Sequence, residues 1–239
     1  MAKVVVINYT GTVGKTTIVA NLLSPRMIDA PIYAIESINE TAETLGLDVE
    51  KLRGNKFREL FKRLILEDDA IVDVGASNVE DFMTNLESFQ EAHEEIDLYV
   101  VPVTSGTKEQ KETLSMINSL AAIGVPPEKI RILFNRVERD VESEFSIVIA
   151  YYRQKQSFWL NTHCAIFETE LFDALAIKRL PLQSIIADET DYKALLKNKD
   201  ASTSDRNSWS DMYGLKLLAK GVNKKLDYVF AELLEGDTL

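Results

Sequence analysis

The segment over residues 4–17, VVVINYTGTVGKTT, constrains the fold of this chain more than any other. Its first part, VVVIN, is a β-branched run without polar alternation, which is typical of a strand buried on both faces of a parallel sheet. Its last part, Gly14-Lys15-Thr16-Thr17, opens a helical stretch that runs to residue 23. A buried strand that leads through a glycine turn into a helix N-terminus directs backbone N–H groups at an anion. The segment therefore predicts a phosphate-binding loop.

The rest of the chain alternates short apolar runs with helical stretches. We expect further strands over residues 31–37, 70–75, 96–103, 130–137 and 164–168. We expect helices over residues 56–66, 79–93, 108–124, 141–157 and about 211–234. This order predicts an α/β fold, a mostly parallel sheet with helices on both faces, as in P-loop NTPases. Its strands end at one edge, where open sheets of this kind bind ligands.

The 239 residues contain no repeat and no low-complexity linker, so we expect a single domain over residues 1–239. The stretch 197–211 is rich in Ser, Asp and Asn and predicts a loop. We expect the last helix, with apolar residues at helical spacing, to pack on the sheet. No apolar run reaches the roughly 18 residues of a membrane span, and Cys164 has no partner for an intrachain disulfide. We therefore expect a cytoplasmic protein without a membrane anchor.

The chain is acidic, with a net charge of −11 and a pI near 4.8. Its overall field repels nucleic acid and anionic lipid, so direct DNA contact would need a local basic patch or a partner. The basic stretches 56–63 and 216–225 are candidates for such a patch, and a solvated helix face is the alternative. The C-terminal AELLEGDTL is acidic, which disfavours an amphipathic membrane anchor.

A variant phosphate-binding loop fits this chain better than the general motif, whose first glycine is replaced by Tyr9. The ParA/MinD superfamily carries the loop Lys-Gly-Gly-x-Gly-Lys-Thr, and residues 10–16, Thr-Gly-Thr-Val-Gly-Lys-Thr, resemble it. Segments 68–78, 96–109 and 131–137 resemble later strands of the same superfamily, in the same order. More narrowly, VGKTTIVANLLSPR and AIESINET look like the StbB plasmid-stability proteins of conjugative plasmids.

The resemblance implies a protein that binds Mg-ATP or Mg-ADP and acts in plasmid partition, stability and conjugative transfer. It implies a nucleotide-dependent homodimer and a DNA-binding partner protein of the same plasmid system. The implied nucleotide-binding residues are Thr10, Gly11, Thr12, Val13, Gly14, Lys15, Thr16, Thr17, Asn135 and Arg136, with Asn135 at the adenine. The implied magnesium residues are Thr16 and Asp73, and the catalytic candidates are Lys15 and Glu36. Segments 36–41 and 73–79 would be switches that respond to the γ-phosphate.

Two departures from the superfamily pattern fall on the hydrolytic machinery. Thr10 replaces the leading lysine that contacts the partner's nucleotide, and Ile38 replaces the second switch aspartate, which positions water. Loss of such a cation typically costs about 10³–10⁵ in rate, by analogy with an arginine finger. We therefore expect slow or partner-dependent hydrolysis. The candidate substitutes are Glu36 and Glu40 for the carboxylate and Arg136, Arg139 and Arg26 for the cation.

Two other functions fit the same residues. One is a nucleotide-gated adaptor that does not hydrolyse ATP, which Thr10 and Ile38 favour. The other is a small-molecule ligase or kinase of the same superfold, which would need a substrate pocket beside the loop. Simpler structural roles also remain open, a helix cap for Asp73, a turn residue for Asn135 and a strand-end acid for Glu36.

Overall fold

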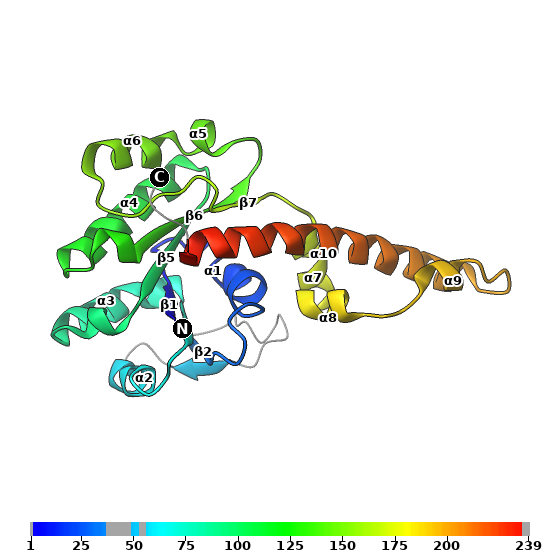
Figure 1. The fold of residues 1–239 in the computed structure, drawn as a ribbon, viewed down its shortest axis with the longest axis horizontal. Coiled ribbons are helices and arrows are strands. Elements are labelled where there is room, and N and C mark those ends of the chain that lie inside the picture. Colours follow the sequence, from blue (N-terminus) through cyan, green and yellow to red (C-terminus); the bar gives the residue numbers. More distant parts are fainter. Residues whose placement is uncertain (1, 37–48, 53–55, 236–239) are drawn as a thin grey trace.

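The computed structural model describes residues 2–36, 49–52 and 56–235. At its centre lies one sheet of seven parallel strands in the spatial order β3-β2-β4-β1-β5-β6-β7 (Figure 1). The strands are β1 (Lys3–Val6), β2 (Ile32–Ile35), β3 (Glu50–Leu52), β4 (Ala70–Val74), β5 (Leu98–Val103), β6 (Ile130–Val137) and β7 (Ala165–Phe167). The prediction of an α/β fold with a parallel sheet is confirmed, and β3 is an additional edge strand.

Side chains of the central strand β1 alternate between two hydrophobic cores, one on each face of the sheet. Val5 packs in one core, and Val4 and Val6 pack in the other. The register places Val4 beside Ile71 of β4 and Leu98 of β5. Burial on both faces explains why this strand is a continuous run of β-branched residues.

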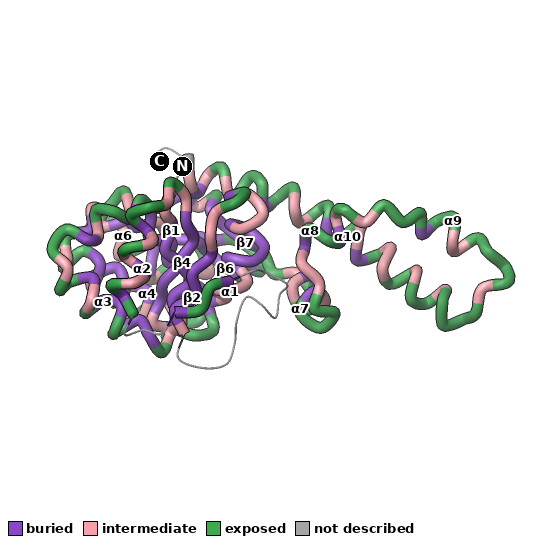
Figure 2. The backbone as a smooth tube through the Cα atoms, turned by 90° about the horizontal axis from the view of Figure 1, so that it is seen from below, coloured by how far each residue is buried: buried purple, intermediate pink, exposed green. Residues whose placement is uncertain are grey.

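Helices cover both faces of the sheet, as predicted (Figure 2). One core contains residues of α2 (Phe57–Leu64), α3 (Val79–Ser88), α4 (Thr107–Ala122) and α6 (Ser146–Lys155). The other contains residues of α1 (Lys15–Ile18), the π-helical turn η1 (Val19–Leu23), α7 (Leu171–Lys178), α8 (Leu182–Ala187) and α10 (Thr203–Glu235). The remaining short segments are η4 (Ala76–Asn78), η5 (Ala92–Glu95), η6 (Pro127–Lys129), α5 (Val141–Glu144) and α9 (Tyr192–Leu196).

The last helix differs most from the sequence-based expectation. The prediction of a loop over 197–211 was wrong for its second half, because α10 begins at Thr203. Ser202 explains this start, since its hydroxyl accepts the backbone N–H of Asp205 at 3.1 Å and donates to the Asp205 carboxylate at 2.7 Å. The Ser- and Asp-rich stretch thus caps a helix. Figures 1 and 2 show that α9 and the first half of α10 project from the body of the molecule.

The second half of α10 packs on the sheet, as predicted. Leu226, Val229 and Leu233 belong to the same core as Val100 of β5. Other helices differ from the expectation in their boundaries: the stretch 141–157 divides into α5 and α6, and α7, α8 and α9 were not predicted. Within the described residues, none of the helices is long and apolar enough to cross a membrane.

Candidate functional site

Asn8 fixes the start of the loop that joins β1 to α1. Its side chain is fully buried, and its amide donates to the carbonyl of Pro102 at 2.8 Å and to the Thr113 hydroxyl at 2.7 Å. Its Oδ1 accepts the backbone N–H of Thr10 at 3.2 Å. One side chain therefore ties the loop to the end of β5 and to α4.

The next two residues of the loop also contact α4. The Tyr9 hydroxyl lies 3.0 Å from the Ser119 hydroxyl, so the residue at the missing-glycine position directs its side chain to α4. The Thr10 hydroxyl donates to the Glu112 carboxylate. Thr10 therefore supplies no charge at this position, and its hydroxyl is held by a carboxylate of its own chain.

Gly14 makes the sharp turn into α1. Its φ is +81°, and a Cβ there would lie 2.6 Å from the Asn135 amide nitrogen. That amide donates to the carbonyl of Val13 at 2.9 Å, and its Oδ1 accepts the backbone N–H of Arg136 at 3.0 Å. A side chain at residue 14 would adopt a strained backbone and displace Asn135, so this position requires glycine. Asn135 braces the loop from the end of β6.

Lys15 lies buried over the loop. Its Nζ donates to the carbonyls of Asn8 at 3.1 Å and Thr10 at 2.7 Å, which leaves one of its three N–H donors. Burial lowers the pKa of Lys15 from 10.5 to about 8, partly opposed by the negative charge of Asp73. An anion in the loop would restore the solvation that this ammonium group loses on burial.

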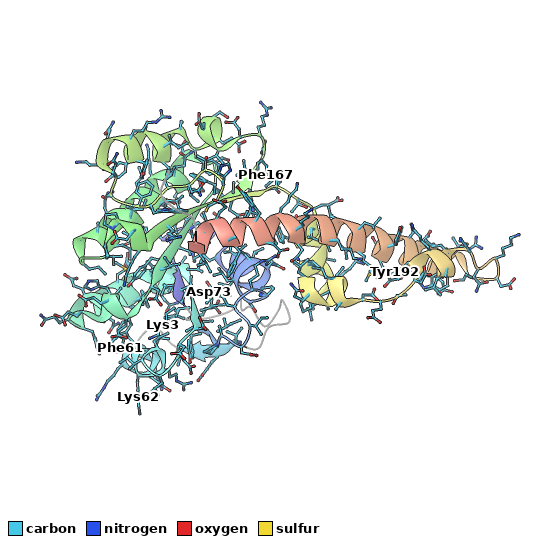
Figure 3. All side chains as sticks on the ribbon, viewed as in Figure 1. Lys3, Phe61, Lys62, Asp73, Phe167 and Tyr192 are labelled. Carbon is cyan, nitrogen blue, oxygen red and sulfur yellow. The ribbon has the colours of Figure 1, made fainter. Side chains whose placement is uncertain are left out.

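Thr16 of α1 contacts Asp73 near the end of β4, and Figure 3 labels Asp73. The Thr16 hydroxyl donates to Asp73 Oδ2 at 2.7 Å, whereas Asp73 Oδ1 is buried without a hydrogen bond from the described residues. Burial raises the pKa of Asp73, and the Thr16 hydrogen bond and the Lys15 charge oppose this. A hydroxyl beside a buried carboxylate oxygen fits a hydrated Mg²⁺, which takes one or two protein ligands plus water and phosphate. No group of three or more His, Cys, Asp or Glu side chains in the described ranges forms a metal cage.

Two adjoining cavities open at this edge of the sheet. The first, of about 640 Å³, lies between the loop, Glu36, Asp73 and the turn after β4. The second, of about 340 Å³, lies between Asn135 and α7. They share Gly14, Thr17 and Arg136, and we call them together the cleft.

The cleft contains most of the predicted site residues. Those that line it are Gly11, Thr12, Gly14, Lys15, Thr16, Thr17, Glu36, Asp73, Asn135 and Arg136. Thr10 and Val13 also belong to the loop, but their side chains are buried and do not line the cleft. Ile38 and Glu40, with the rest of the predicted switch after Glu36, lie outside the described residues.

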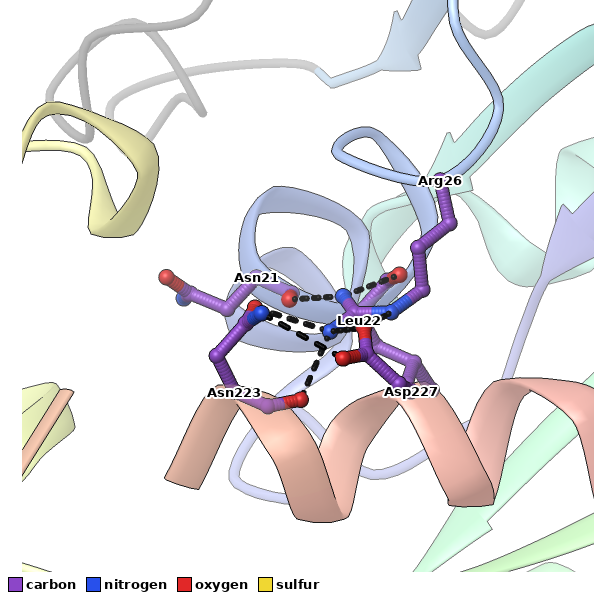
Figure 4. A network of polar contacts seen from close by, with 5 residues as sticks. All are labelled: Asn21, Leu22, Arg26, Asn223 and Asp227. Carbon is purple, nitrogen blue, oxygen red and sulfur yellow. Dashed lines mark hydrogen bonds and ion pairs between the residues drawn. The ribbon is translucent and has the colours of Figure 1, made fainter. Parts of the chain in front are cut away.

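The three candidate cations occupy different places. Arg136 is exposed, has a φ of +55° at an irregularity between β6 and β7, and lines both cavities. Arg139 is exposed but lines neither cavity. Arg26 holds η1 to α10 instead (Figure 4): its guanidinium lies 2.7 Å from the Asp227 carboxylate and donates to Asn223 Oδ1 at 2.9 Å. Among the candidates, Arg136 is the cation at the cleft.

Several residues of the site were not predicted from the sequence. Asn8, Glu112 and Thr113 position the loop through contacts between distant segments. Phe172 and Asp173 line the second cavity from α7, a helix that the periodicity did not reveal. The one available signal was Asn8 itself, a polar residue at the end of an apolar run.

Comparison with solved structures identifies the fold. MinD from Aquifex aeolicus in complex with MinC superposes with a TM-score of 0.58 at 14% identity, covering 100% of this chain and 97% of that one. MinD from Pyrococcus horikoshii with Mg-ADP gives 0.54 at 14% identity, covering 93% and 96%. The ATP complex of a Cyanothece McdA variant gives 0.51 at 14% identity, covering 93% and 97%. The fold is that of the MinD-type P-loop ATPases. No protein-family model and no curated protein sequence matches the chain.

Proposed function

We propose that this chain binds Mg-ATP and Mg-ADP in the cleft. Lys15 and the backbone amides of residues 11–17 would bind the phosphates, and Thr16 and Asp73 would hold Mg²⁺, directly and through water. The second cavity, beside Asn135, would hold the base. The observation that carries the proposal is the buried Lys15 ammonium next to the Thr16–Asp73 pair, with one Asp73 oxygen lacking a hydrogen bond from the described residues.

The residues of the cleft would share the work of phosphoryl transfer. Bound Mg²⁺ would supply positive charge against the phosphate oxygens. Lys15 would hold the β- and γ-phosphates in place, and Arg136 lies where a guanidinium could stabilise developing negative charge. Glu36 lines the same cavity and would orient water. Thr10 supplies no cation, which supports slow or partner-dependent hydrolysis.

Nucleotide binding and phosphate release test this function separately. We expect a fluorescent ATP analogue to bind the wild type in the presence of Mg²⁺ and to bind Lys15→Ala at least tenfold more weakly. Phosphate release is then measured with and without DNA, with Lys15→Ala as the blank. Slow turnover that Arg136→Ala reduces further would support the ATPase proposal. Failure of the wild type to bind nucleotide would refute it.

A non-hydrolysing adaptor is the second candidate. The hydrogen bond of Thr10 to Glu112 favours the adaptor. The residue at the position of the superfamily's leading lysine is neutral, and its hydroxyl is bound to a carboxylate of the same chain. Tight nucleotide binding without turnover, with DNA present or absent, would select the adaptor. A ligase or kinase is less well supported, because Lys15 and Arg136 are the only cations that line the cleft in the described part of the chain.

At the biological level, we propose a cytoplasmic, StbB-like protein for plasmid partition, stability and conjugative transfer. It would form an ATP-dependent homodimer and act with a DNA-binding protein of the same plasmid. MinD from Aquifex aeolicus has the same fold and was solved in a complex with MinC. That complex supports the idea that a second protein recognises this scaffold. Size-exclusion chromatography with ATP, ADP and no nucleotide tests the homodimer, and an unchanged elution volume would argue against it.

A further inference from the structure

A further hollow, separate from the cleft, lies between β7 with the turn before it and the second half of α10. Its volume is about 530 Å³, and its walls are mainly apolar. Phe167 and Tyr228 line it and are 46% and 51% exposed, so two aromatic side chains face solvent. The labelled Phe167 lies at the β7 edge of the sheet in Figure 3. We call this hollow the β7–α10 groove.

Gly221 keeps the floor of the groove open. It lies within the 33-residue helix α10, where glycine costs about 1 kcal/mol relative to alanine. A Cβ at Gly221 would meet no atom within 4 Å, and its φ is not in the left-handed region. Neither packing nor backbone conformation therefore requires glycine here. The bare position leaves room for a group from outside the chain.

Two lysines line the groove. Lys224 and Lys225 are exposed and form no ion pair with any carboxylate of the described residues. The protein as a whole carries a net charge of −11, so a pair of unpaired cations beside exposed aromatic rings is a local exception. The surface is complementary to a ligand that is both apolar and negatively charged.

The groove lies beside β7, an edge strand of the described sheet, where the Ala165 N–H donates to the carbonyl of His163 at 2.8 Å. β7 is the last strand of the sheet and pairs with β6 on one side. Edge strands present backbone N–H and C=O groups that an extended peptide can use. We propose that the β7–α10 groove binds an extended acidic peptide segment of a partner protein, with an aromatic or aliphatic side chain over Gly221 and carboxylates against Lys224 and Lys225.

A peptide fits this surface better than nucleic acid does. Non-specific DNA binding depends on neutralising several phosphates with a row of basic side chains. The groove offers two such lysines, and the rest of its wall is mainly apolar. An apolar centre with polar groups at its rim is the usual arrangement of protein–protein interfaces.

Selection from a random twelve-residue phage-display library tests the proposal on the full-length protein. We expect the enriched peptides to contain an aromatic or large aliphatic residue flanked by Asp or Glu. The affinity of a fluorescein-labelled enriched peptide is then measured by fluorescence polarisation. Gly221→Leu fills the groove with a good helix former, and we expect it to weaken binding at least tenfold without lowering the melting temperature.

Each test variant has a control variant that carries the same substitution outside the groove. Gly214→Leu makes the same substitution seven residues earlier in α10, also with no atom within 4 Å of the new Cβ, and should leave the affinity unchanged. Lys224→Glu/Lys225→Glu should weaken binding at least tenfold, whereas Lys197→Glu/Lys199→Glu in the exposed stretch before α10 should not.

Three results would overturn the proposal. The first is a selection that enriches no peptide, or only basic ones. The second is an enriched peptide that binds Gly221→Leu as well as wild type. The third is that a 40-base-pair DNA duplex binds through Lys224 and Lys225 while the enriched peptides do not. The substituted residues line neither cavity of the cleft, whereas Phe167 lines both the groove and the second cavity, so peptide affinity is measured without nucleotide.

Discussion

Lys15 is a buried cation whose protonation depends on what occupies the cleft. Without an anion, burial lowers its pKa to about 8, so the ammonium form is lost as the pH rises above that value. A bound phosphate would stabilise the charged form and raise the pKa, which couples nucleotide binding to proton uptake above pH 8. If nucleotide binds as proposed, its affinity should be highest below pH 8.

The first prediction is a pH dependence of nucleotide affinity. Between pH 7 and pH 9 we expect the dissociation constant for Mg-ATP to rise about tenfold, because each tenfold loss of the protonated free form costs about 1.4 kcal/mol. Titration with a fluorescent ATP analogue across this range provides the measurement. Lys15→Met should bind weakly and show no such rise. A wild-type affinity that stays constant up to pH 9 would contradict the lowered pKa.

The second prediction concerns Gly14. Gly14→Ala places a side chain at a φ of +81° and against the Asn135 amide. We therefore expect the free energy of unfolding to fall by about 1–3 kcal/mol and nucleotide binding to weaken by a similar amount. Gly11→Ala is the matched control, since its Cβ would lie 3.7 Å from Ala76 Cβ, an ordinary contact. Urea unfolding and nucleotide titration of both variants make the test. Equal effects of the two substitutions would show that the turn is not what requires glycine.

The loop residues were predictable because their chemistry is local. Gly14, Lys15 and Thr16 act through backbone geometry and short-range contacts that a motif of seven residues encodes. Asn8 was not predicted, because its partners Pro102 and Thr113 lie 94 and 105 residues away in sequence. Such contacts follow from the order of strands in the sheet, which the sequence pattern does not specify.

At the scale of elements, Arg26 joins the helical segment after the loop to the last helix. Its guanidinium donates to the carbonyls of Asn21 and Leu22 and contacts Asn223 and Asp227 of α10 (Figure 4). The Arg26 side chain is 9% exposed, so these contacts are largely shielded from water. Arg26 therefore connects η1 and α10, two segments about 200 residues apart in the sequence.

The third prediction follows from this contact. Arg26→Ala removes the guanidinium hydrogen bonds to three backbone carbonyls, those of Asn21, Leu22 and Asn223, so we expect a loss of about 2–4 kcal/mol in the free energy of unfolding. Lys56→Ala breaks an exposed ion pair with Glu59 and should cost less than about 0.5 kcal/mol. Urea unfolding compares the two variants. If Arg26 were instead a catalytic cation, Arg26→Ala would lower phosphate release while leaving stability unchanged.

The elements of the first two thirds of the chain were easier to predict than those of the last third. Strands β1, β2, β4, β5 and β6 are mainly apolar runs that the sheet buries, so composition reveals them directly, whereas the polar edge strand β3 was not predicted. After β7 the chain forms the short helices α7, α8 and α9, each too short to show a clear periodicity. The start of α10 is polar because Ser202 and Asp205 cap it, and the same residue types are common in loops.

At the scale of the whole molecule, net charge affects the proposed homodimer. Each copy carries a net charge of −11, so like-charge repulsion opposes the proposed homodimer at every distance within the screening length. Salt shortens that length from about 30 Å at 0.01 M to about 10 Å at 0.1 M. Dimerisation of this chain should therefore be favoured by salt, whereas binding of a basic surface to DNA is weakened by it.

The fourth prediction concerns the salt dependence of dimerisation. In the presence of Mg-ATP, we expect the dimer fraction measured by light scattering after size-exclusion chromatography to rise between 20 mM and 300 mM NaCl. Lys15→Ala, which should not retain the nucleotide, should stay monomeric at both concentrations, so a rise in that variant would indicate non-specific association. A wild-type dimer that dissociates as salt increases would mean that attractive ion pairs across the interface outweigh the net charge, and the interface would then have to lie on one of the few basic surfaces of the chain.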